Sequence, residues 1–178
     1  MLYQISNIIT TIRLILALVF LYLFTQTNLI VEASIIFMIA AVSDFFDGWI
    51  ARKLKISSKF GEQYDPIADK VLTLSAFVAF AIENIIPMWC VIIIAVRDIA
   101  NTIIRFTFLS KNNIPTSLSA KIKTIIQMIF ITAILIITSI LPEYNNIIYS
   151  PIVFYSILFI TAITIYTMIE YILKIRKI

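Results

Sequence analysis

Four aspartates stand within one short window of an otherwise apolar chain. Asp44 and Asp47 are spaced i, i+3, and Asp65 and Asp69 are spaced i, i+4. On helices, each of these spacings places the two carboxylates on one face. Carboxylates that converge repel one another unless a cation lies between them, and hard divalent cations prefer oxygen ligands. The window therefore predicts a divalent metal site.

The elements that must position these residues are membrane helices. Of the 178 residues, 61% are hydrophobic, and long apolar runs recur along the whole chain. A charged side chain in a bilayer costs roughly 2.5–3.5 kcal/mol on insertion scales, so intramembrane aspartates indicate function. We predict an all-α membrane protein with one domain spanning residues 1–178. Its six transmembrane helices are expected at 7–25, 30–54, 63–83, 87–110, 119–141 and 149–174.

The distribution of lysine and arginine predicts the orientation of these helices. The connection after the second helix holds Arg52, Lys53, Lys55 and Lys59, and the connection after the fourth helix and the C-terminal tail are also basic. The connections on the opposite side hold no lysine or arginine. By the positive-inside rule, the basic side is cytoplasmic, and the aspartates lie there, at the ends of helices 2 and 3. We expect the cytoplasmic membrane of a bacterium, with the first helix retained as an anchor.

The missing residue types exclude several kinds of chemistry. The chain has no histidine and a single cysteine, Cys90. Ser-His-Asp hydrolysis, HExxH metalloproteases and phosphohistidine mechanisms are therefore excluded. Acid–base work is left to carboxylates, lysine or tyrosine. A structural interpretation of the aspartates as a salt-bridge network is disfavoured, because Lys53, Lys55 and Lys59 are expected to face lipid, which leaves Arg52 and Lys70 to pair with four acids.

The window resembles the signature of the CDP-alcohol phosphatidyltransferases, D-x2-D-G-x2-A-R-x8-G-x3-D-x3-D. All eight specified positions match without a gap, from Asp44 to Asp69. The resemblance implies that an alcohol attacks the β-phosphorus of a CDP-linked lipid and that CMP leaves. It implies Asp44, Asp47, Asp65 and Asp69 as ligands of Mg²⁺ or Mn²⁺, with two ions expected. It also implies Asp69 as the general base.

Further residues are candidates for binding the CDP-lipid. Gly48 and Ala51 leave one helix surface open to a nucleotide, and Arg52 offers a planar fork for phosphate oxygens. Gly61 would let the connection turn back over the site. Near the N-terminus, Asn7 and Thr10 lie in Ser6-Asn7-Ile-Ile-Thr10-Thr-Ile-Arg13, which resembles P-N-x-x-T-x-x-R of one subgroup of the family.

Cations elsewhere on the cytoplasmic side bear on the acceptor alcohol. Arg97 and Arg105 are eight residues apart on one predicted helix, and Lys121 and Lys123 begin the next helix. Converging cations suggest an acceptor with its own phosphate. These segments resemble phosphatidylglycerophosphate synthases, with Asp98 in place of the usual Glu and Ala120 in place of Gly. The resemblance implies CDP-diacylglycerol and glycerol 3-phosphate as substrates.

Two other functions stay open at this point. Eukaryotic-type cardiolipin synthases share the aspartate motif, often have Arg-Asp where this chain has Arg97–Asp98, and use phosphatidylglycerol. A metal-ion transporter would also contain intramembrane carboxylates, although such proteins usually have Gly or Pro breaks at the membrane midplane. We expect membrane lipids as neighbours, no nucleic acid as a partner, and a homodimer as a possibility raised by the family.

Overall fold

The computed structural model describes residues 2–26, 29–54, 61–108, 118–141, 143 and 145–175. Within these, it describes the side chains of residues 11–26, 29–43, 70–104, 118–141, 143 and 146–173. Seven helices account for almost all of the described backbone. They are α1 (Leu2–Gln26), α2 (Ile30–Leu54), α3 (Gly61–Ile82), α4 (Met88–Phe108), α5 (Leu118–Ile140), α6 (Asn145–Ile148) and α7 (Pro151–Ile175).

The six long helices lie where the apolar runs predict them, and the all-α fold class is confirmed. α1 already begins at Leu2, so the first residues continue the first helix. Among the described residues, two helices are long and apolar enough to cross a membrane, Leu118–Ile140 and Pro151–Leu173. A six-span topology stays a prediction.

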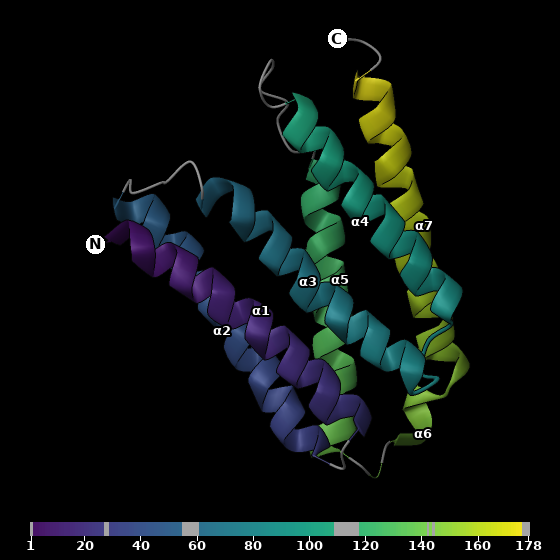
Figure 1. The fold of residues 1–178 in the computed structure, drawn as a ribbon. Helices are drawn as coiled ribbons and strands as arrows, with labels where there is room; N and C mark the ends of the chain where they lie inside the picture. The colour runs from purple at the N-terminus through teal and green to yellow at the C-terminus, as the bar shows by residue number, and fades with distance from the viewer. Residues whose placement is uncertain are drawn as a thin grey trace.

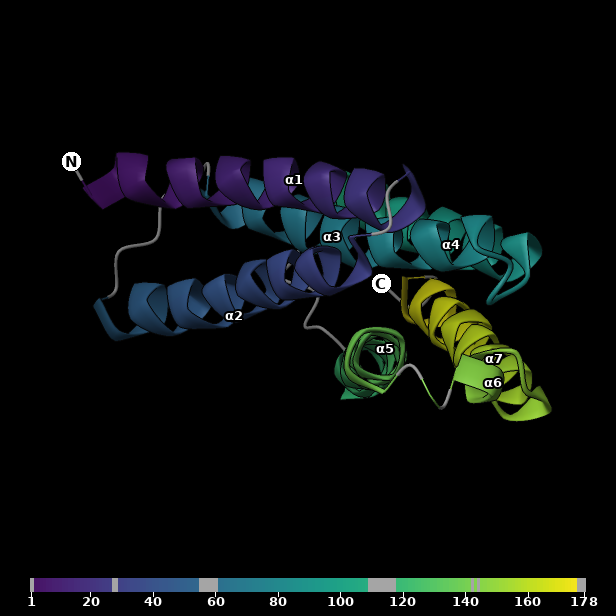
Figure 2. The ribbon, with the colours of Figure 1, turned by 90° about the horizontal axis from the view of Figure 1, so that it is seen from below.

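The helices form a bundle in which α5 lies between α2 and α7, below α3 in the view of Figure 2 (Figures 1 and 2). α1 packs against α2 and α3, α4 packs against α3 and α7, and α5 contacts α2, α3 and α7. Figure 1 shows that the C-terminal ends of α2, α4 and α7 and the N-terminal ends of α3 and α5 lie on the same side. We call this side the site end of the bundle. The aspartate motif and the predicted acceptor cations both belong to helices that have one end on this side.

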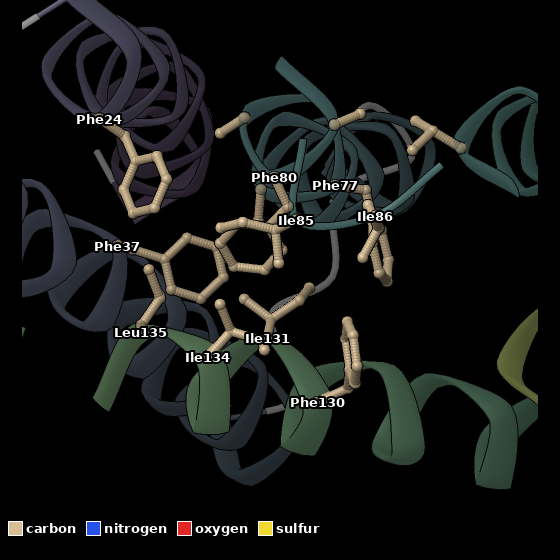
Figure 3. Packing of buried hydrophobic residues seen from close by; sticks show 14 of the residues in the cluster. Phe24, Phe37, Phe77, Phe80, Ile85, Ile86, Phe130, Ile131, Ile134 and Leu135 are labelled. Atoms are coloured by element: carbon tan, nitrogen blue, oxygen red, sulfur yellow. The ribbon is translucent and has the colours of Figure 1, made fainter. Parts of the chain in front are cut away.

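Away from the site end, aromatic and branched side chains fill the centre of the bundle (Figure 3). The Phe24 ring of α1 lies edge-on to Phe80 of α3, with centroids 5.6 Å apart, and Phe20 lies 5.2 Å from Phe37 of α2. Phe77 of α3 stacks on Phe130 of α5 at 6.3 Å. These contacts tie four helices together. We call these six phenylalanines, Phe20, Phe24, Phe37, Phe77, Phe80 and Phe130, the phenylalanine core.

The turn between α3 and α4 is fixed by local hydrogen bonds. Asn84 has a φ of 58°, in the left-handed region that asparagine tolerates better than most residues. The Ile85 N–H donates to the Phe80 carbonyl at 2.8 Å, and the Asn84 N–H donates to the Ala81 carbonyl at 3.1 Å. This pair of bonds is a Schellman motif, which satisfies carbonyls at the helix end. The chain therefore reverses tightly, and α4 returns toward the site end beside α3.

Candidate functional site

The backbone places the aspartate motif on two helices that each have one end on the site end of the bundle. Asp44 and Asp47 lie in the second half of α2, and Asp65 and Asp69 lie in the first half of α3. The helical backbone required by the i, i+3 and i, i+4 spacings is therefore present. The motif side chains lie outside the described ones, and the roles of Asp44, Asp47, Gly48, Ala51, Arg52, Gly61, Asp65 and Asp69 stay predictions.

Metal binding by these residues is not tested by the described side chains. Within that part of the chain, no group of three or more His, Cys, Asp or Glu residues could hold a metal ion. The four aspartates are outside it. Their chemistry fits the expected ions, because carboxylate oxygens are the ligands that Mg²⁺ and Mn²⁺ prefer.

Next to the motif, charged and hydroxyl side chains of four helices form a connected group that we call the polar cluster. Arg97 Nη1 and Lys123 Nζ both donate to Asp98 Oδ1, at 2.8 and 2.7 Å. Arg97 Nη2 also donates to the Thr167 hydroxyl of α7 at 2.9 Å. The cluster consists of Lys70 on α3, Arg97, Asp98 and Thr102 on α4, Lys123 on α5 and Thr167 on α7.

Lys70 connects the polar cluster to the aspartate motif. Its ammonium donates to the Asp98 carbonyl at 3.0 Å and to the hydroxyl of Thr102. Lys70 directly follows Asp69, the predicted general base, on α3. The backbone of the motif and the cations of the cluster are therefore adjacent, one residue apart along α3.

The cations of the cluster are buried and paired. Arg97 is 6% exposed and Lys123 is 2% exposed, and both share one carboxylate. A buried charge needs a partner, because desolvation costs several kcal/mol per ion after relaxation. Asp98 is that partner for both cations, and one oxygen of its carboxylate accepts both hydrogen bonds. Two cationic side chains thus share one carboxylate, and a third, Lys70, contacts the backbone carbonyl of the same residue. Three cations beside a single carboxylate would stabilise a further anion such as a phosphate.

The predicted acceptor residues do not all lie together. Arg97 and Lys123 meet at Asp98, whereas the Lys121 side chain is exposed. Two residues that are two positions apart on a helix are turned by about 200° relative to each other. Lys121 and Lys123 therefore face opposite sides of α5. The side chains of Arg105, Asn7 and Thr10 lie outside the described ones.

Sequence reasoning missed several members of this site. Asp98 appeared only as a departure from a family pattern, and Lys70 only as a possible partner of the motif aspartates. Thr167 belongs to a buried stripe with Thr161 and Thr164 on α7. Its spacing of three residues in an apolar helix is a signal that could have found it. Gln127, also buried, is a polar residue one turn beyond Lys123.

Known proteins resemble the chain over nearly its whole length. Residues 3–166 match the family described as CDP-alcohol phosphatidyltransferase. CDP-diacylglycerol--glycerol-3-phosphate 3-phosphatidyltransferase of Rickettsia typhi is 35% identical over 172 residues, 94% of each chain. The protein of that name from Rickettsia felis is 34% identical over 98% of this chain and 96% of its own. A probable phosphatidylglycerophosphate synthase of Mycobacterium tuberculosis is 35% identical over 72% of this chain and 64% of its own.

Proposed function

The chain belongs to the CDP-alcohol phosphatidyltransferase family, and on that basis we propose that it transfers a phosphatidyl group from CDP-diacylglycerol to glycerol 3-phosphate. As a member of this family, it is a transferase of phospholipid synthesis. The names of its relatives support the choice of both substrates. Its apolar helices and its bacterial relatives support a membrane protein. We further propose that the site end faces the cytoplasm, in line with the basic connections on that side.

The observation that supports glycerol 3-phosphate as the acceptor is the charge of the polar cluster. Arg97 and Lys123 are buried and share the carboxylate of Asp98, and Lys70 contacts the same residue through its carbonyl. Such a surplus of cations suits the phosphate of glycerol 3-phosphate, a dianion near neutral pH, better than the phosphodiester monoanion of phosphatidylglycerol. We therefore assign Arg97 and Lys123 to the acceptor phosphate. Lys121, which is exposed, is left outside the proposed site.

The aspartate motif would serve the other substrate, CDP-diacylglycerol. Asp44, Asp47, Asp65 and Asp69 are the proposed ligands of Mg²⁺ or Mn²⁺. When bound, such ions would neutralise the diphosphate and stabilise the leaving phosphate. Asp69 would accept the proton of the acceptor hydroxyl as its oxygen bonds to the β-phosphorus. The bond from that phosphorus to the bridging oxygen then breaks, and CMP leaves with the bonding electrons.

An acceptor panel tests this proposal. The full-length protein in detergent would receive CDP-diacylglycerol, Mn²⁺ or Mg²⁺, and one of five acceptors: glycerol 3-phosphate, phosphatidylglycerol, serine, inositol phosphate or choline. We expect CMP release with glycerol 3-phosphate and little with the other acceptors. Chelation of the metal with EDTA should stop the release, and added Mn²⁺ should restore it.

Three outcomes would contradict the proposal. CMP release with phosphatidylglycerol but not glycerol 3-phosphate would identify a cardiolipin synthase. CMP release undiminished by thorough chelation would remove the metal from the reaction. Uptake of Mn²⁺ into vesicles without CMP release would favour a transporter.

A further inference from the structure

Gln127 of α5 is a buried polar side chain whose amide donor is unused. Its side chain is 2% exposed. Its Nε2 makes no hydrogen bond with any part of the chain that the structure describes. A buried donor without an acceptor costs roughly 1–3 kcal/mol. Natural proteins rarely retain such a group in a helix core without a ligand, a water molecule or an ion to pair with it.

The position of Gln127 relates it to the polar cluster. It lies four residues after Lys123, on the same buried face of α5, and about 6 Å further along the helix axis. Three residues beyond it, Phe130 stacks on Phe77 of α3. Gln127 is therefore the last polar side chain on this face between the cations of the cluster and the phenylalanine core.

The neighbouring helix α3 supports the same placement. α3 and α5 both begin at the site end and run away from it, crossing each other at an angle (Figures 1 and 2). Lys70 and Lys123 both contact Asp98, and seven residues beyond each of these lysines stand the paired rings Phe77 and Phe130. Gln127 therefore lies at a level between the Asp98 contacts and the Phe77–Phe130 pair. This level is close to the residues that we assign to the acceptor phosphate.

We propose that the Gln127 amide donates a hydrogen bond to the C2 hydroxyl of the acceptor and thereby selects glycerol 3-phosphate over phosphorylated alcohols that lack this hydroxyl. The inference rests on the proposed function, which fixes the phosphate near Arg97 and Lys123. A phosphate held by those cations leaves the glycerol carbons within reach of a donor one helical turn away. A neutral amide fits a hydroxyl oxygen, since it brings no charge that would compete with Asp98 for the cations.

A comparison of two acceptors tests the inference. The second acceptor is 3-hydroxypropyl phosphate, which is glycerol 3-phosphate without its C2 hydroxyl. In the wild-type protein we expect kcat/KM to be about tenfold higher for glycerol 3-phosphate, the value of one neutral hydrogen bond. In Gln127→Met, which keeps the length of the side chain but has no donor, that ratio should fall to about one. The ratio should fall because kcat/KM for glycerol 3-phosphate decreases, while kcat/KM for the analogue stays within about twofold of wild type.

Gln26→Met is the matched control, because it makes the same exchange at an exposed position at the other end of the bundle. It should keep the wild-type ratio. An unchanged ratio in an active Gln127→Met protein would overturn the inference and assign the amide to internal structure. A wild-type ratio near one would overturn it whether or not the variant folds. Failure of the proposed function looks different, because the wild-type protein would then use neither phosphorylated acceptor.

Discussion

The polar cluster and the phenylalanine core share two helices, α3 and α5, but are held together by different forces. α3 contributes Lys70 to the first and Phe77 to the second, and α5 contributes Lys123 and Phe130. In the core, rings fit together by shape (Figure 3). In the cluster, two cations depend on one carboxylate. A membrane protein gains little from removing apolar groups from lipid, so packing and pairing must stabilise these two levels separately.

Because of this difference, the residues that stabilise the fold and the residues that we assign to the reaction lie at different levels of the bundle. Truncating a core ring removes contacts that any side chain of the right volume could replace. Removing one partner of a buried ion pair leaves the other charge without compensation. Buried charge is retained at the site end despite that cost. We infer that the cluster is kept for its ligand, and that activity and stability should respond to substitutions at different levels.

The largest expected effect is on turnover, from Asp69→Asn at the site end. If Asp69 takes the proton of the acceptor hydroxyl, its loss should lower kcat by at least about a hundredfold, the usual contribution of a general base. CMP release measures this directly. Helix content by circular dichroism and the melting temperature should stay near the wild-type values.

Glu83→Gln serves as the matched control for Asp69→Asn. Glu83 lies in the turn after α3, at the opposite end of the same helix, and the exchange is again carboxylate for amide. Its kcat should be close to that of the wild-type protein. Near wild-type turnover in Asp69→Asn would remove Asp69 from the mechanism.

The core should show the converse pattern. Phe80 is fully buried and contacts Phe24 of α1, so Phe80→Ala should lower the free energy of unfolding by roughly 3 kcal/mol. That value is at the low end for a core phenylalanine, because lipid already solvates the ring in the unfolded reference state. Denaturant or thermal unfolding in detergent measures it, and KM for both substrates should hardly change.

Phe159→Ala is the comparison for Phe80→Ala. Phe159 is 60% exposed on α7, so its truncation should cost less than about 1 kcal/mol. Equal costs for the two substitutions would mean that the rings of the core are not packed as Figure 3 shows.

Much of the fold followed from the sequence, because apolar length and turn residues determine where membrane helices begin and end. The predicted range 30–54 coincides with α2, and the gap between the predicted helices 63–83 and 87–110 coincides with the turn after α3. The first helix was expected to begin at residue 7, whereas α1 begins at Leu2. Polar side chains at a helix end can face the interface and continue the helix.

The site was predictable only where residues lie close in sequence. The aspartate motif occupies 26 positions, so its spacing is visible in the chain. The contact of Asp98 with Lys123 spans 25 residues and depends on how α4 and α5 pack. The contact of Arg97 with Thr167 spans 70 residues. No local pattern specifies such packing. The sequence therefore indicated Arg97 and Lys123 as candidates but not that the Asp98 carboxylate joins them.

The smallest of these effects distinguishes two lysines that the sequence treats alike. The sequence predicts that both Lys121 and Lys123 bind the acceptor phosphate. Of the two, Lys123 is buried and bonded to Asp98, whereas Lys121 is exposed. Lys123→Met should raise KM for glycerol 3-phosphate about tenfold, since a charge-assisted bond to phosphate is lost, and leave KM for CDP-diacylglycerol unchanged. Lys121→Met should change KM for glycerol 3-phosphate less than about twofold, because a solvated lysine contributes little. Equal effects of the two substitutions would show that the phosphate binds at the surface of α5, and that the polar cluster is a structural ion pair.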